Sequence, residues 1–183
     1  MDDAAMQAVL DEVRAIPTDT PLEPEETRAI YRRLHDLAER RFAPARAFCA
    51  SCLARLDAEW RSIAVMCLHH YDLDDAPALL DRLRWMLGNE PDSDVRIWIA
   101  GILGAQPTGA DAWPDRALAR ALDDDPNFQV RANAFRGLIE TAGIPYPQAQ
   151  QALQQMERGE IPITWAAIER IVAAAQGDTQ TRG

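Results

Sequence analysis

The sequence predicts an all-α fold of about ten helices. Apolar residues recur at helical spacing along nearly the whole chain, and the alternation typical of strands is almost absent. Short stretches rich in Asp, Pro and Gly separate the later apolar segments, as expected for turns between helices. The 183 residues are 48% hydrophobic and 26% charged, a composition that excludes a mainly disordered chain.

The first two helices are predicted from their apolar faces and from the prolines that bound them. One helix ends before Pro17, and a second begins near Pro24, where proline suits the first turn. Their buried faces are predicted to be Met6, Val9, Leu10 and Val13 in the first helix, and Ile30, Leu34, Leu37 and Ala38 in the second.

A repeat of 35 residues links the helices that follow. Arg61, Arg96 and Arg131 are separated by this spacing, and each follows an apolar residue. Each copy has a first helix, an acidic turn and a second helix, here called helix A and helix B. One further step from Val130 reaches Trp165, which is predicted to open the last helix; Ala166 there replaces the arginine.

The segment from Leu122 to Arg131, followed by Ala134 and Leu138, resembles the HEAT-like repeat family. This resemblance implies a right-handed α-solenoid of about five helical hairpins, forming one domain over residues 1–183. Its best-matching repeats would span residues 44–141, between N-terminal capping helices (1–43) and a C-terminal capping repeat (142–177). The missing arginine at position 166 fits a terminal cap, because an end repeat has no neighbour to stack upon.

In HEAT-like repeats, the turn acid and the helix B arginine are hydrogen-bonded across neighbouring repeats. The resemblance therefore implies a ladder in which Arg61, Arg96 and Arg131 take the arginine place. The acid place falls to Asp57, to Glu90 or Asp92, and to one of Asp123, Asp124 and Asp125, with Asp92 and Asp124 as the choice.

The best candidate metal ligands are Cys49, Cys52 and Cys67, together with His69 and His70. However, all three cysteines fall on the stripe that packs helix A against helix B, where cysteine acts as a small apolar residue. The sequence thus favours a core position for the thiols, with no metal and no cofactor. It contains no nucleophile elbow, HExxH, P-loop or dinucleotide fingerprint, so no catalytic residue is predicted.

The charge of the chain restricts its partners. All 19 basic residues are arginine, against 29 Asp and Glu, and the net charge of -10 argues against nucleic-acid binding. No apolar stretch is long enough to cross a membrane, and the acidic start is unlike a signal peptide, so we expect a cytoplasmic monomer. A protein or peptide partner is expected, and a basic one would be attracted.

The outward face of helix B is the predicted binding surface, because helix B commonly lines the concave face of HEAT-like solenoids. The candidate contacts are Met66, Ile97, Trp98, Phe135 and Arg136. The alternative is that superhelical twist buries several of them between adjacent B helices. The functional hypothesis is a non-catalytic protein-interaction module. Two alternatives remain: a bilin-lyase-like or chaperone activity, and an acidic immunity-type inhibitor of a basic toxin.

Overall fold

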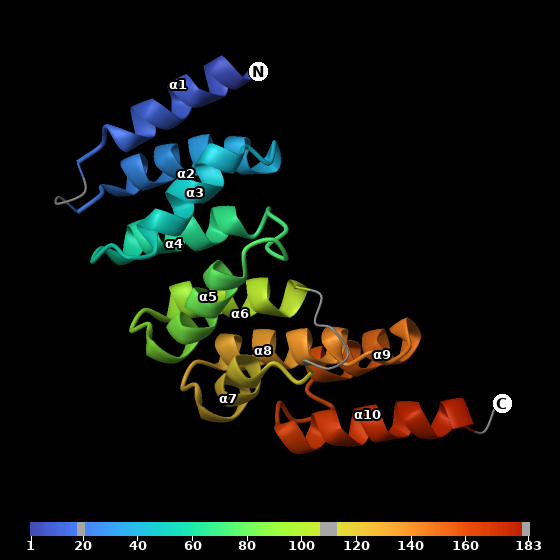
Figure 1. Ribbon diagram of the computed structural model, residues 1–183. Helices are drawn as coiled ribbons and strands as arrows, with labels where there is room; N and C mark the ends of the chain where they lie inside the picture. The colour runs from blue at the N-terminus through green and yellow to red at the C-terminus, as the bar shows by residue number, and fades with distance from the viewer. Residues whose placement is uncertain (18–20, 107–112, 181–183) are drawn as a thin grey trace. The chain divides into compact units, whose positions relative to one another are not determined.

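The computed structural model describes residues 1–17, 21–106 and 113–180, with side chains described as far as residue 175. Over these residues the protein is entirely helical, with ten helices and no strand, which confirms the all-α prediction (Figure 1). The helices are α1 (Asp3–Arg14), α2 (Pro24–Glu39), α3 (Ala43–Cys52), α4 (Ala58–Leu68), α5 (Pro77–Asn89), α6 (Ser93–Ala105), α7 (Arg116–Asp124), α8 (Phe128–Thr141), α9 (Tyr146–Glu157) and α10 (Trp165–Gln180). Within the described part of the chain, no helix has the length and apolar character that a membrane span requires.

Local side chains fix where most of these helices begin. A capping side chain accepts a backbone N–H of the first turn, which satisfies a donor that the helix itself leaves unpaired. Side chains cap five helices in this way: Asp2 for α1, Asp57 for α4, Asp92 for α6, Asp115 for α7 and Asn127 for α8. The helix α2 begins at Pro24, as predicted, behind a capping box formed by Glu23 and Glu26.

The chain groups into two compact units, Met1–Asp72 and Leu73–Gly183, and their boundary falls inside the stretch assigned to the best-matching repeats. In the first unit α3 packs on α4, α2 packs on α4, and α1 packs on α2. Its largest fully buried side chain is that of Trp60, which meets the ring of Phe48 edge-on.

The three cysteines lie in the core of the first unit, the position that the sequence favoured. A hydrogen bond with Cys67, together with burial, raises the pKa of the Cys49 thiol well above its usual range. Burial also raises the pKa of Cys52 to about 11, because the apolar surroundings disfavour a thiolate. The thiols of Cys49 and Cys52 therefore stay protonated at neutral pH.

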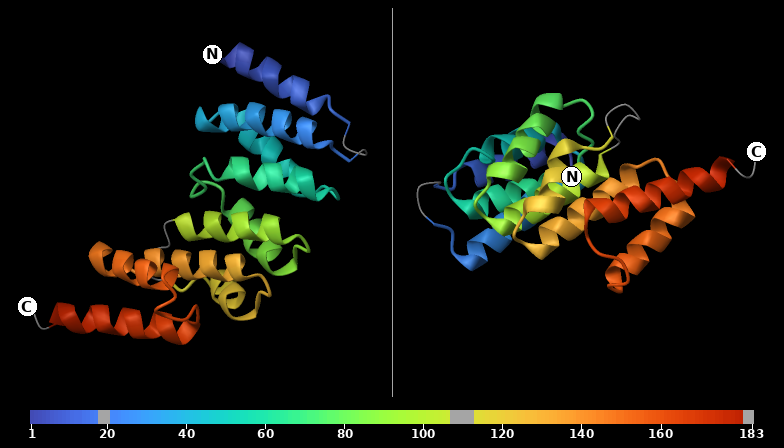
Figure 2. Two further views of the ribbon diagram at one scale, coloured as in Figure 1. Left: turned by 180° about the vertical axis from the view of Figure 1, so that it is seen from behind. Right: turned by 90° about the horizontal axis from the view of Figure 1, so that it is seen from below.

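The second unit is built around two consecutive hairpins, α5–α6 and α7–α8. The helix α6 lies along α8, α5 lies along α7, and α10 packs on both α7 and α8 (Figures 1 and 2). The contact between α6 and α8 is a backbone contact at one point. A Cβ atom added to Gly104 would lie 2.6 Å from the Cα of Gly137, so glycine is required there by the close approach.

The 35-residue repeat is visible in three turns. In each, one arginine Nη1 donates to the carbonyls of the residues six and five positions before it, and so holds the turn that precedes its own helix. These bonds join Arg61 to Arg55 and Leu56 (2.9 and 2.6 Å), Arg96 to Glu90 and Pro91 (2.9 and 3.0 Å), and Arg131 to Asp125 and Pro126 (2.7 and 3.1 Å).

Arg96 also reaches the next turn, where it forms a two-pronged ion pair. Its Nε lies 2.7 Å from Asp125 Oδ2, and its Nη2 lies 3.1 Å from Asp125 Oδ1. The two side chains are only 11% and 6% exposed. Within the second unit, this pair ties the turn before α6 to the turn before α8, because Arg96 holds both.

The acids assigned to the ladder require a correction. Asp57 and Asp92 are the N-caps of α4 and α6, and Asp124 is an exposed residue at the end of α7. The acid that meets Arg96 is Asp125, and the residue 35 positions earlier is Glu90.

Both of these acids lie two residues before an N-cap, and each accepts the N–H of that cap residue. The bond from Asp92 N to Glu90 is 3.0 Å long, and the bond from Asn127 N to Asp125 is 2.8 Å long. For Asp125, this position two residues before the N-cap also places the carboxylate against Arg96.

Candidate functional site

The predicted binding residues on the B helices are only partly accessible. Phe135 is fully buried, so its assignment as a contact residue is wrong. Met66, in the first unit, and Ile97, in the second, are half-buried. Trp98 is 37% exposed, and Arg136 is exposed with its Nη2 2.6 Å from Glu157 Oε1.

The cause of this burial is the packing of α6 against α8. Ala100 and Gly104 of α6, on the same helical face as Ile97, and Ile139 of α8, on the same face as Phe135, are also buried. The amide of Asn133 joins the two helices by donating to the carbonyl of Ile97 at 3.0 Å. In the second unit, the apolar stripe therefore packs helix against helix, which was the alternative interpretation.

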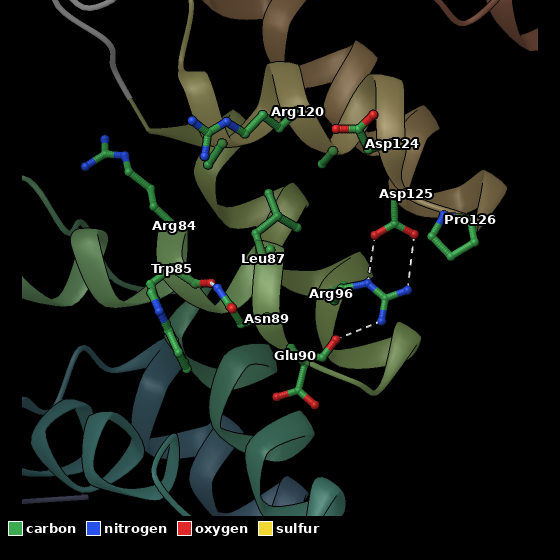
Figure 3. A pocket seen from close by; sticks show the side chains of 13 residues that line it. Arg84, Trp85, Leu87, Asn89, Glu90, Arg96, Arg120, Asp124, Asp125 and Pro126 are labelled. Atoms are coloured by element: carbon green, nitrogen blue, oxygen red, sulfur yellow. Dashed lines mark hydrogen bonds and ion pairs between the residues drawn. The ribbon is translucent and has the colours of Figure 1, made fainter.

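A cleft lies instead on the side of α5 and α7, with a volume of about 680 Å³ (Figure 3). Residues of the C-terminal half of α5, of α7 and of the turns that follow the two helices line it. Its lining consists of Arg84, Trp85, Leu87, Gly88, Asn89, Glu90, Arg96, Ala117, Arg120, Ala121, Asp124, Asp125 and Pro126.

Trp85 is the largest apolar side chain in this lining, and it is 55% exposed. The buried face of α5 is formed by Leu83, Met86 and Leu87, and Trp85 lies outside that face. Its ring has the guanidinium of Arg82 at 4.7 Å, a contact within cation–π range. An exposed indole beside a cleft provides a large, rigid surface that only a bound molecule would cover.

Two of the three arginines in the lining are held by carboxylates. Arg84 Nε lies 2.9 Å from Asp115 Oδ2, and Arg84 Nη1 lies 3.0 Å from Asp81 Oδ1. Burial lowers the pKa of Arg84, but the bonds and charges of Asp115 and Asp81 outweigh this effect and raise it overall. For Arg96, the hydrogen bonds of Asp125 are the main cause of a raised pKa.

Arg120 differs from these two arginines. It is exposed on α7, and within the described residues no carboxylate or carbonyl partner holds its guanidinium. Arg120 and Asp124 are one helical turn apart on α7, so the cleft offers one available cation and one exposed anion.

The cleft lining combines charged, amide, aromatic and apolar side chains. None of the lining residues described is a serine, threonine, cysteine, histidine or tyrosine, so the lining provides no nucleophile with an adjacent base. Guanidinium, indole and amide groups instead favour recognition of a polar chain with an apolar side group. A signal for this site is present in the sequence, because Trp85 lies between the buried positions Leu83 and Met86 of α5, whereas the prediction placed the binding surface on helix B.

Comparison with known proteins identifies no relative of the chain. No family model matches the chain, and neither a curated protein nor a solved structure shows significant similarity to it.

Proposed function

We propose that the protein is an α-solenoid of HEAT-like helical hairpins that binds a peptide segment of a partner protein, without catalysis. The repeated arginine turns and the packing of consecutive hairpins support the architecture. The observation that carries the function is the exposed ring of Trp85 beside a 680 Å³ cleft. A cleft of this volume is within the usual range of binding sites.

The proposed ligand is a segment that carries an acidic side chain next to an apolar one. Trp85 would cover the apolar side chain, and Arg120 would pair with the carboxylate. The chain has a net charge of -10, but the lining holds three arginines against Glu90, Asp124 and Asp125. The cleft is thus close to neutral on an otherwise acidic protein, so an acidic segment meets the least repulsion there.

The site can be tested without knowing the partner by selecting peptides from a random displayed library on the full chain. Enriched peptides would then be measured by fluorescence polarisation against the wild type and variants. We expect Trp85→Ala and Arg120→Ala each to weaken binding by about tenfold or more, as truncation of central aromatic and arginine residues commonly does.

Matched controls on neighbouring helices separate the cleft from other surfaces. Trp98→Ala removes an exposed indole from α6, and Arg116→Ala removes an exposed guanidinium from the first turn of α7. Both variants should bind the selected peptides as the wild type does. Loss of binding in Trp98→Ala, with Trp85→Ala unaffected, would move the site to α6 and refute the proposal.

A further inference from the structure

All three histidines of the chain lie together in the first unit. His35 is on α2, whereas His69 and His70 directly follow α4. The ring centres of His35 and His70 are 4.6 Å apart and nearly perpendicular, and those of His69 and His70 are 6.0 Å apart. Two segments well separated in sequence thus bring their imidazoles to one place.

Two carboxylates lie beside His35. Ligand atoms of His35, Asp36 and Glu39 are all within 4.8 Å of one another. His35 and Glu39 are one turn apart on α2, so their side chains leave the same face of the helix. Although the chain has 19 arginines, neither carboxylate has a hydrogen bond or ion pair with any described residue.

The spacing of the rings fits coordination of one ion. A metal–nitrogen bond of about 2.1 Å places an imidazole centre roughly 3.2 Å from the ion, so two tetrahedral ligands have ring centres about 5.2 Å apart. The ring centres of His35 and His70 are about 0.6 Å closer than that, so the two imidazoles need only a small separation to reach one ion. Both rings are half-buried and the carboxylates are exposed, so an ion can enter from solvent.

We propose that His35, Asp36 and Glu39, with the imidazole of His70 next to that of His35, bind one divalent transition-metal ion of the Zn²⁺ or Co²⁺ class. Imidazole and carboxylate groups are typical ligands of such ions, whereas Mg²⁺ and Ca²⁺ prefer oxygen ligands alone. A further bond from His70 to the ion would cross-link α2 to the segment after α4, and so hold the two elements together. The site differs from the one considered from the sequence, since it uses no cysteine.

The test is a titration of the untagged full chain with Co²⁺, followed by visible absorption and by equilibrium dialysis. We expect one ion per chain and the absorption of nitrogen- and oxygen-bound cobalt. His35→Ala and Glu39→Gln should each weaken binding by about tenfold or more, since even the loss of a supporting outer-shell group commonly has an effect of that size.

Glu25→Gln is the matched control, because it makes the same change at an exposed position of the same helix and should leave binding unchanged. Circular dichroism of each variant verifies that it is folded. The proposal is overturned by the absence of saturable binding in the wild type, or by unchanged binding in both His35→Ala and Glu39→Gln. A thiolate-to-cobalt charge-transfer band would overturn it too, by assigning the ion to the cysteines.

Discussion

Two contacts join the same pair of hairpins in the second unit, and they differ sharply. Where α6 meets α8, glycines 104 and 137 let the backbones touch, and the apolar side chains around them are buried. Where α5 meets α7, the helices are joined by the ion pair of Arg84 with Asp115 and leave a cleft open beside it. The contact of α6 with α8, here called the closed contact, therefore excludes water through close packing. The contact of α5 with α7, here called the open contact, leaves a surface that a ligand can reach.

This difference separates residues that stabilise from residues that bind. Removing or adding atoms at the closed contact changes interior packing, which proteins tolerate poorly. Trp85 and Arg120 at the open contact already face solvent, so changing them has a small effect on folding. The apolar face of α6 and α8 is the one that the neighbouring helix covers, so apolar character on a helix face did not indicate a binding surface here.

The largest expected effect is that of Gly137→Ala at the closed contact. The added Cβ would lie 2.5 Å from the Cα of Gly104, and a backbone atom cannot rotate away. Because α6 and α8 must separate to make room, we expect a loss of about 3 kcal/mol in the free energy of unfolding, at the upper end for overpacked interiors. Urea denaturation followed by circular dichroism measures it.

Gly88→Ala is the same substitution on the open side, and it should have the opposite sign. An added Cβ at Gly88 meets no atom within 4 Å, and the residue lies in the last turn of α5. We expect a gain of about 0.5–1 kcal/mol from the better helix propensity of alanine. Equal effects of the two substitutions would show that the contacts do not differ as described.

A smaller loss in the free energy of unfolding is expected for Arg96→Ala. This substitution removes the hydrogen bonds to the carbonyls of Glu90 and Pro91 and the ion pair with Asp125 in the next turn. Asp125 would keep the N–H of Asn127 but would lose its charged partner in a nearly buried place. We expect a loss of about 2–3 kcal/mol, as for a charge-assisted network that loses one member. Arg158→Ala is the exposed comparison, and an equally large loss there would contradict the assigned role.

The smallest loss is expected for Arg84→Ala, which breaks the corresponding ion pair at the open side. Its guanidinium is partly exposed, and Asp115 keeps the N–H groups of Ala117 and Leu118 as acceptor of two backbone bonds. We expect a loss of about 1 kcal/mol or less, since partly exposed pairs contribute little. A loss as large as that of Arg96→Ala would mean that the cleft wall depends on this pair.

The repeat illustrates how far the sequence could predict local structure. The spacing of Arg61, Arg96 and Arg131 identified three equivalent arginines, and all three hold the turn before their own helix. The acids could not be assigned in the same way. Several carboxylates occur within a few residues of each turn. Only the exact position in the backbone decides whether a carboxylate caps a helix, as Asp92 does, or meets the arginine, as Asp125 does.

The binding residues were harder to predict, for a different reason. Phe135 and Trp85 are both aromatic residues within helices. The sequence around each residue does not indicate whether another helix covers its ring. Phe135 is covered and Trp85 is not, because the approach of α6 to α8 leaves no space while α5 and α7 leave a cleft. The histidines illustrate the same limit, since His35 and His70 are 35 residues apart in sequence yet adjacent in space.

The sequence by itself determined the helical class, the start of α2, the start of α10 and the equivalence of the three arginine turns. These features depend on periodicity, prolines and spacing, which act over a few neighbouring residues. Only the tertiary structure decided which carboxylate meets Arg96, which aromatic ring stays exposed, and which histidines meet. Such pairings depend on distances between segments far apart in the chain, and these distances are fixed by how closely one helix backbone can approach another.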